Sequence, residues 1–339
     1  MPPLSLTELE EIESERGRLL ARLAELDAIL ARDRAAVPGE SVHDACWVLL
    51  SSTGLIGRWD SGTDLPASGP RQTHDVITAA VRTSGDFGYL TSAGRVVRAD
   101  PSALPAIEVT DNPPNLQGTR RAVDLVELAP GERIVGLTSL SPKLFGWALG
   151  TRQGVVKRAN PEIKRQDEWS IIRLDEGDEV IGALDLRADS QALIFITTDA
   201  QLLRFPASTV RPQGIAAGGM AGIKLAPGEE AIFFGAADPD AMVVTNAARV
   251  QGYQTDAGSV KLTPLAQFPE KGRATGGVRC QRFLKGEGVL RLGWVGPSPV
   301  IAATATGSPS NLPAVESRRD ASGVPVASVL AAFGTRTLR

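Results

Sequence analysis

The chain has 339 residues, with 36 Lys and Arg against 39 Asp and Glu, for a net charge of −3. This balance excludes strong steering of the whole chain toward a polyanion, so any electropositive surface has to be local. Two cysteines and two histidines exclude a disulfide framework, and they indicate neither a metal site nor a cofactor. Because no apolar run reaches membrane length and no targeting segment is visible, we expect a soluble cytoplasmic protein.

The first segment predicts one α-helix from Leu6 to Leu30. A Thr-x-x-Glu capping box at Thr7 and Glu10 begins it. Apolar residues three and four apart then form a narrow stripe of Leu9, Ile12, Leu19, Leu23, Leu26 and Leu30. The stripe favours the end of a coiled coil whose partner helix lies outside this chain, and the alternative is a helix packed against its own domain. We assign residues 1–36 to this arm and 37–339 to a second domain.

A short phrase recurs six times after the helix: Ser or Thr, two residues, then Gly or Ala. The copies are Ser51–Gly54, Thr91–Gly94, Thr151–Gly154, Thr197–Ala200, Thr245–Ala248 and Thr304–Gly307. An apolar run precedes every copy, and in most copies a second apolar run ending in Arg follows. A strand, a tight turn and a strand form a β-hairpin. The intervals between copies are typical of propeller blades.

A second phrase alternates with the first: an apolar residue, two residues, Gly and an acid. It occurs at Leu128–Glu132, Leu174–Asp178, Leu225–Glu229 and Phe283–Glu287. Each copy stands before an apolar strand. Each repeat is therefore predicted to be a four-stranded unit, and six such units with a continuous core count as one domain.

These phrases resemble the repeat of the C-terminal domain of the A subunit of bacterial type IIA topoisomerases, which are DNA gyrase and topoisomerase IV. That repeat runs as an apolar strand, Thr-x-x-Gly-x-x-x-Arg, a loop, a Gly-rich strand ending in Leu, and a Gly-acid turn. Ser51–Arg58, Thr91–Arg98 and Thr151–Arg158 match its first part, and Gly218–Leu225 matches the Gly-rich strand. The first helix resembles the final helix of the coiled-coil arm that precedes this domain in the full-length protein.

The resemblance implies an all-β fold, a six-bladed β-pinwheel whose blades exchange strands, with duplex DNA bent around its rim. It leaves open whether the ring is a closed disc or a spiral. The implied partners are double-stranded DNA, the B (ATPase) subunit, and the N-terminal breakage-reunion part of the same polypeptide, in a nucleoid-associated location.

The resemblance also implies that the nucleophilic tyrosine lies elsewhere in the complete enzyme. Tyr89 and Tyr253 each lie in a strand-like run, and neither stands beside an Arg in a loop. We therefore expect a non-catalytic part of an ATP-dependent topoisomerase that presents or selects DNA segments. The alternative is a propeller-type scaffold that binds another protein without wrapping DNA.

A surface that bends DNA needs Lys and Arg on phosphates rather than contacts to base edges. The candidates are the basic residues that close the hairpins and those of the loops that follow. They are Arg58, Arg71, Arg95, Arg98, Arg120, Arg121, Lys157, Arg158, Lys164, Arg165, Arg204, Arg211, Lys224, Lys271, Arg273 and Arg279. The alternative is that they are edge charges that discourage pairing between sheets. Because the fifth and sixth copies lack the closing Arg, we expect the DNA path on blades two to four.

One departure from gyrase lies in the loop of the first blade. Gyrase carries there a box of Gln, Arg/Lys, Arg, Gly, Gly, Arg/Lys and Gly that fixes the start of the DNA wrap. Here residues 60–73 hold one Arg, Arg71, and no Gly-Gly pair. The chain therefore resembles topoisomerase IV or a divergent relative more than a strong gyrase wrapper, and whether the parent enzyme supercoils DNA stays open.

Overall fold

The computed structural model describes residue 12 and residues 15–26, 45–61, 63–66, 76–249 and 256–335. The chain divides into two compact units, Met1–Val42 and His43–Arg339. The boundary that the sequence predicts after residue 36 falls outside the described residues and stays a prediction.

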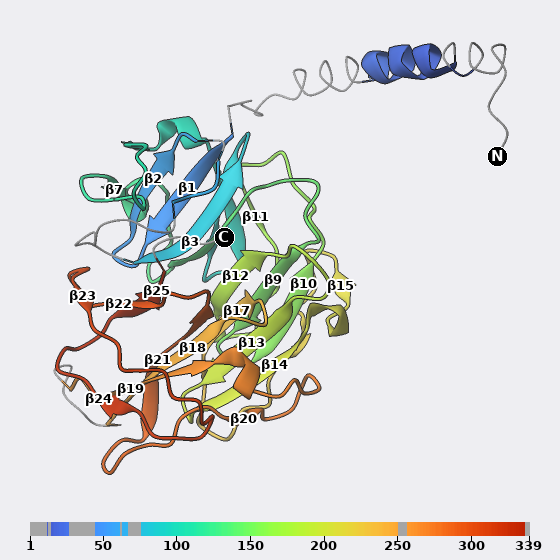
Figure 1. Ribbon diagram of the computed structural model, residues 1–339. Coiled ribbons are helices and arrows are strands. Elements are labelled where there is room, and N and C mark those ends of the chain that lie inside the picture. The colour runs from blue at the N-terminus through green and yellow to red at the C-terminus, as the bar shows by residue number, and fades with distance from the viewer. Residues whose placement is uncertain are drawn as a thin grey trace, which may run out of the picture. The chain divides into compact units, whose positions relative to one another are not determined.

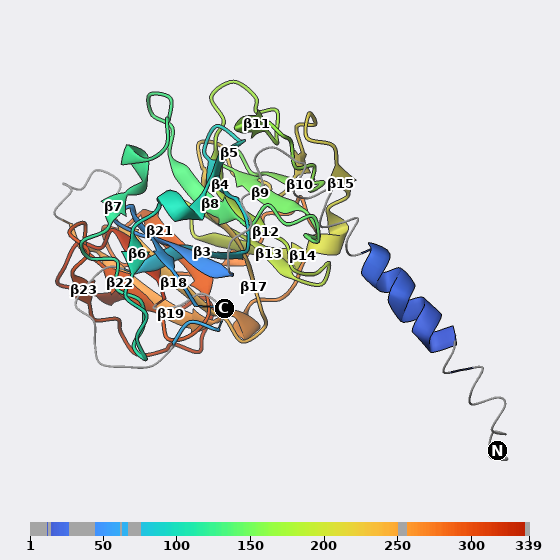
Figure 2. The same ribbon diagram turned by 90° about the horizontal axis from the view of Figure 1, so that it is seen from above.

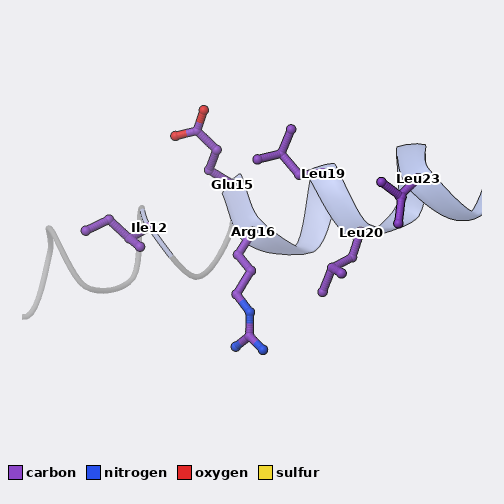
Figure 3. A pocket seen from close by; sticks show the side chains of 6 residues that line it. All are labelled: Ile12, Glu15, Arg16, Leu19, Leu20 and Leu23. Atoms are coloured by element: carbon purple, nitrogen blue, oxygen red, sulfur yellow. The ribbon is translucent and has the colours of Figure 1, made fainter. Parts of the chain in front are cut away.

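The first unit contains the predicted helix, which is described at residue 12 and over residues 15–26. All of these residues are exposed. Three members of the apolar stripe, Ile12, Leu19 and Leu23, line an open groove along the helix with Glu15, Arg16 and Leu20 (Figure 3). Both predicted helix ends and the capping box lie outside the described residues, so the coiled-coil interpretation stays a prediction. No described helix is long and apolar enough to span a membrane.

The second unit consists of six β-sheets, which form the six blades of a ring (Figures 1 and 2). A hairpin occupies the centre of each sheet. An inner strand lies on one side of the hairpin, and in five sheets one or two short outer strands lie on the other side. The predicted all-β, six-bladed arrangement is therefore confirmed.

Blades are numbered by their hairpins in chain order. Blade one contains β1 (Cys46–Ser51), β2 (Leu55–Trp59), inner β3 (Ile77–Thr83) and outer β6 (Ala106–Ile107) and β7 (Arg120–Arg121). Blade two contains β4 (Phe87–Thr91), β5 (Arg95–Ala99), inner β8 (Ile134–Thr138) and outer β11 (Glu168–Ser170). Blade three contains β9 (Trp147–Thr151), β10 (Val155–Ala159), inner β12 (Val180–Asp185) and outer β15 (Pro212–Gln213) and β16 (Met220–Ala221).

The other three blades follow the same plan. Blade four contains β13 (Ala192–Thr197), β14 (Gln201–Pro206), inner β17 (Ala231–Ala237) and outer β20 (Val278–Arg279). Blade five contains β18 (Met242–Ala248), β19 (Ser259–Pro264), inner β21 (Val289–Gly296) and outer β24 (Val324–Pro325). Blade six contains β22 (Ile301–Ala303), β23 (Pro309–Ser310) and β25 (Ala332–Gly334). Short 3-10 turns connect strands at η1 (Pro101–Ala103), η2 (Ala122–Asp124), η3 (Ala207–Thr209) and η4 (Leu265–Gln267).

The outer strands are exchanged between neighbouring blades. β7 comes after the β4–β5 hairpin of blade two but pairs with β2 of blade one. In the same way β11 follows the blade-three hairpin and pairs with β5, and β16, β20 and β24 each pair one blade back. This is the exchange that the resemblance implies.

The small residue that ends each of the first four repeated phrases provides a backbone contact for the exchanged strand. The carbonyl of Gly94 accepts a hydrogen bond from Ile171 N at 2.8 Å. Gly94 has φ +72°, and a Cβ there would lie 2.2 Å from Cγ2 of Ile172. Ala200 in blade four accepts the equivalent bond from Cys280 N, also at 2.8 Å, with φ 62°. Turn conformation and close approach therefore both favour a residue with little or no side chain.

The expected turn of the fifth hairpin is wrong. The phrase Thr245–Ala248 lies inside strand β18, and the returning strand β19 begins at Ser259. The residue with the contacts of the phrase glycine is Gly258, which has φ +65° and accepts a hydrogen bond from Val326 N. Strand β18 therefore continues through Thr245–Ala248, and the hairpin turns at Gly258 instead.

The ring closes between its last and first blades. Ile77 N, at the start of β3, donates to Thr335 O at 3.0 Å, immediately after β25. A Cβ on Gly334 would lie 2.6 Å from Ile77 O, so the two backbones approach closely here. The structure is thus a closed ring.

The apolar core lies in the seams between blades. One cluster joins Ala148 and Val156 of blade three to Phe195, Phe205 and Phe234 of blade four, with Phe195 and Phe234 ring centroids 4.8 Å apart. Each blade is therefore stabilised by its neighbours, as in other repeat architectures.

Candidate nucleic-acid interface

The arginines that close the first four hairpins lie between blades. They occupy the seventh position after the first residue of each phrase and are Arg58, Arg98, Arg158 and Arg204. Arg58 Nη1 donates to Pro101 O, and Arg204 Nη1 donates to Leu265 O, each at 3.3 Å. Both acceptors belong to the connection that follows the next hairpin. We call these four residues the bridging arginines, because each contacts a segment that connects its blade to a neighbour.

Carboxylates neutralise three of the bridging arginines. Arg98 Nη1 lies 2.9 Å from Asp86 Oδ2, whose side chain is 7% exposed. The guanidinium also donates to Lys164 O and lies over the Trp169 ring, 5.7 Å from its centroid. Arg158 is buried and lies 2.6 Å from Asp189, and Arg58 pairs with Asp60 at 2.7 Å. These guanidinium groups stabilise the ring, and their ion pairs leave little net positive charge to attract a phosphate.

Arg95 is also engaged within the protein. Its Nε and Nη2 each lie 2.7 Å from the Glu132 carboxylate, a bidentate arrangement. Nη1 donates to Glu168, and Nη2 donates to Glu127 O at 2.9 Å. The hydrogen bonds from Arg95 lower the pKa of Glu132 to about 2. Glu132 belongs to a Gly-acid turn, so this pair explains the acid of the second phrase in this blade.

Lys157 is fully buried. Its Nζ donates to Ile215 O at 2.8 Å and to Ala217 O at 2.7 Å, in the segment between β15 and β16. Burial lowers the pKa of Lys157 to about 8. Lys261 occupies the same third position of strand β19 and donates to Cys280 O and Arg319 O, and burial lowers its pKa to about 8 as well. Both lysines hold the segments that carry outer strands, and neither reaches the surface.

The remaining candidates divide by exposure. Seven are exposed and lie on or beside the outer strands: Arg120, Arg121, Arg165, Arg211, Lys224, Lys271 and Arg279. Lys164 is partly exposed and lies 3.3 Å from Glu162, while Arg273 is half-buried and donates to Ala221 O at 2.5 Å. Arg71 and most of the loop expected to carry the gyrase box lie outside the described residues.

Among the candidates, the exposed residues therefore lie at the outer edges, whereas those at the hairpin ends are engaged within the protein. The seven belong to the outer edges of blades one to four. The blade-six strands β22, β23 and β25 contain no Lys or Arg. Phosphate oxygens accept hydrogen bonds from Lys and Arg side chains and from backbone N–H groups. An edge that exposes both kinds of donor is therefore suited to bind phosphates.

Tyrosine and cysteine side chains, which could serve as nucleophiles, are also among the described residues. Tyr89 is 1% exposed, and burial raises the pKa of its hydroxyl. Cys46 and Cys280 are buried, and burial raises the pKa of Cys280 to about 12. Within the described ranges, no group of three or more His, Cys, Asp or Glu residues is placed to hold a metal ion. Tyr253 lies outside these ranges.

The fold and the exposed Lys and Arg at its edges define a class: a strand-exchanged β-propeller ring with basic residues on or beside the outer strands of consecutive blades. The family described as the DNA gyrase C-terminal domain, a β-propeller, matches residues 170–186, 191–236 and 254–292. Two solved structures share the fold. One is the C-terminal domain of DNA topoisomerase IV, with a TM-score of 0.65 and 18% identity over 87% of this chain and 93% of that one. The other is the DNA gyrase A C-terminal domain, with a TM-score of 0.58 and 16% identity over 86% and 99%.

Curated relatives are DNA gyrase A proteins. That of Mycolicibacterium smegmatis is 26% identical over 60% of this chain and 23% of its own length. That of Escherichia coli K12 is 29% identical over 47% and 18%, and that of Helicobacter pylori is 37% identical over 30% and 13%. The chain thus spans less than a quarter of each relative. These matches confirm the resemblance that the repeat phrases indicate: the chain is similar to the gyrase A C-terminal domain, by the family's match at residues 170–186, 191–236 and 254–292 and by its fold.

Proposed function

We propose that this chain binds duplex DNA along the outer edges of blades two to four and bends it around the ring. The observation that carries the proposal is the division of the basic residues. The bridging arginines, Arg95 and Lys157 are engaged inside the protein, whereas the outer-strand residues are exposed. Exposed Lys and Arg at the outer edges of several consecutive blades match a bent duplex, whose phosphates follow one curved path.

The proposal includes a place in a larger enzyme. The gyrase A relatives are more than four times as long as the region that this chain matches. The bent duplex would be presented to the breakage-reunion part of such a protein, with a B subunit supplying ATP hydrolysis, in the cytoplasm at the nucleoid. The domain itself would position DNA without catalysing a step.

Duplex binding at several salt concentrations tests the proposal. The variant Arg165→Gln/Lys271→Gln removes two exposed charges beside the outer strands of blades two and four. The matched control, Lys143→Gln/Arg187→Gln, removes one Lys and one Arg from exposed positions in the loops before β9 and after β12. We expect the first variant to lower affinity and the slope of log K against log salt, by about 0.9 per lost phosphate contact. No detectable binding by the unmodified chain would instead support a protein-binding scaffold.

A further inference from the structure

The outer strands share a position that becomes visible when they are aligned by their backbone contacts. It is the third residue after the end of each outer strand, and we call it the exit position. In blades one to five the exit positions are Asp124, Arg173, Lys224, Arg282 and Ser328. These positions are equivalent because each follows the same backbone contact. In each of these blades, the backbone N–H of the residue directly after the outer strand donates to a backbone carbonyl. That carbonyl belongs to the residue just before the second strand of the hairpin.

These anchoring hydrogen bonds are alike in the blades concerned. Ile171 N donates to Gly94 O at 2.8 Å, Gly222 N to Gly154 O at 2.9 Å, and Cys280 N to Ala200 O at 2.8 Å. The exit position stands two residues beyond each donor. Arg173, Lys224 and Arg282 are therefore structurally equivalent, although they lie 51 and 58 residues apart in the chain.

Buried neighbours fix the backbone at these three positions. The preceding residues, Ile172, Ile223 and Gln281, are 4%, 4% and 1% exposed. The following residues, Leu174, Leu225 and Phe283, pack against the core clusters of their seams. The basic side chain between each pair is exposed. A basic residue held between two anchored neighbours keeps its backbone position, so less conformational freedom is lost when it meets a phosphate.

Blades one and five lack this arrangement. Asp124 belongs to the 3-10 turn η2 and carries the wrong charge for a phosphate. Ser328 has no charge, and its neighbour Val329 is 37% exposed rather than buried. The anchored basic exit position is thus confined to the arc of blades two to four.

We propose that Arg173, Lys224 and Arg282 form one phosphate-binding track that sets the register of duplex DNA on three consecutive blades. The inference rests on the proposed function, and it adds Arg173 and Arg282 to the residues that bind DNA. Arg282 lies 3.6 Å from Asp320, with both side chains more than half exposed. Such a pair contributes little to stability, so a phosphate can replace the carboxylate at low cost.

The test compares two double variants of the full chain by titration of a duplex longer than two helical turns. Arg173→Gln/Lys224→Gln removes one Arg and one Lys from exit positions, and Lys143→Gln/Arg187→Gln again serves as the charge-matched control. We expect the exit variant to reduce the salt slope by about 1.8 and affinity on the order of tenfold or more at moderate salt. Adding Arg282→Gln should lower the slope by about 0.9 further.

The outcomes separate the track from the general proposal. Equal losses in the exit and control variants, with wild-type binding intact, would overturn the track while leaving DNA binding in place. An unchanged slope in the exit variant would do the same. Absence of binding by the wild-type chain would overturn the proposed function itself. Circular dichroism and thermal unfolding of each variant show that the comparison concerns folded protein.

Discussion

At the scale of the residue, the bridging arginines are predicted to act on stability. Arg98→Ala leaves the buried Asp86 carboxylate without its ion-pair partner. Loss of one partner of a buried pair typically costs about 3 to 5 kcal/mol, so we expect a loss near the lower value in urea unfolding. Arg165→Ala, at an exposed position, should change the free energy of unfolding by less than about 0.5 kcal/mol. Equal stability of the two variants would refute the assignment of Arg98 to a bridge.

The buried lysines predict a pH dependence of stability. The pKa of Lys157 is about 8 in the folded chain and about 10.4 in the unfolded one, so the unfolded state binds more protons between these values. The contribution of Lys157 to the free energy of unfolding therefore rises with pH from about 8 to 10.4. Relative to Lys157→Met, the wild-type chain should gain about 2 kcal/mol between pH 7.5 and 10. If the free energies of unfolding of the wild-type chain and of Lys157→Met changed with pH in the same way, the burial of this ammonium group would be contradicted.

At the scale of the element, the glycines of the two repeated phrases differ in what surrounds them. Gly94 and Gly131 both have positive φ, but a Cβ meets Ile172 only at Gly94, and nothing lies within 4 Å at Gly131. Alanine at either site carries the cost of a left-handed conformation, about 1 kcal/mol. Gly94→Ala should lose about 1 to 3 kcal/mol more, because the seam is overpacked. Thermal unfolding measures both, and a smaller loss for Gly94→Ala than for Gly131→Ala would disprove this account.

The sequence predicts the turn of each hairpin correctly except in the fifth blade. Strands beginning at Ile134 and Val180 follow the Gly-acid turns as expected. The fifth hairpin fails because the sequence holds a second candidate, Thr255-Asp256-Ala257-Gly258, and spacing alone favours the earlier one. Only the contact of Gly258 with the exchanged strand distinguishes the two, and that contact joins residues distant in the chain.

Whether a basic side chain is exposed likewise depends on the tertiary structure and not on the local sequence. Arg158 and Arg165 are both predicted from the repeat as DNA contacts, yet one is buried against Asp189 and the other is exposed. A repeated Arg in a strand signals equally a phosphate contact and a bond between blades. The exit positions carry a weak signal, a basic residue before Leu or Phe, that becomes visible once the outer strands are aligned.

At the scale of the whole molecule, ring closure depends on a short contact. Gly334→Val places a side chain against Ile77 O and should separate β25 from β3. Hydrogen exchange of the Ile77 amide should then accelerate roughly tenfold or more, while the amides of β13 in blade four exchange as before. Unchanged protection of Ile77 would show that the ring does not depend on this bridge.

Bending of duplex DNA by the whole ring is the central claim, and energy transfer between dyes on the two ends of a duplex measures it directly. A duplex of about 40 base pairs is far shorter than the persistence length of about 150 base pairs, so its free ends stay apart. Addition of the chain should raise transfer efficiency in proportion to binding, and Arg173→Gln/Lys224→Gln should lower the protein affinity that the transfer reports. A duplex that is saturated with protein and keeps its free end-to-end distance would contradict the account.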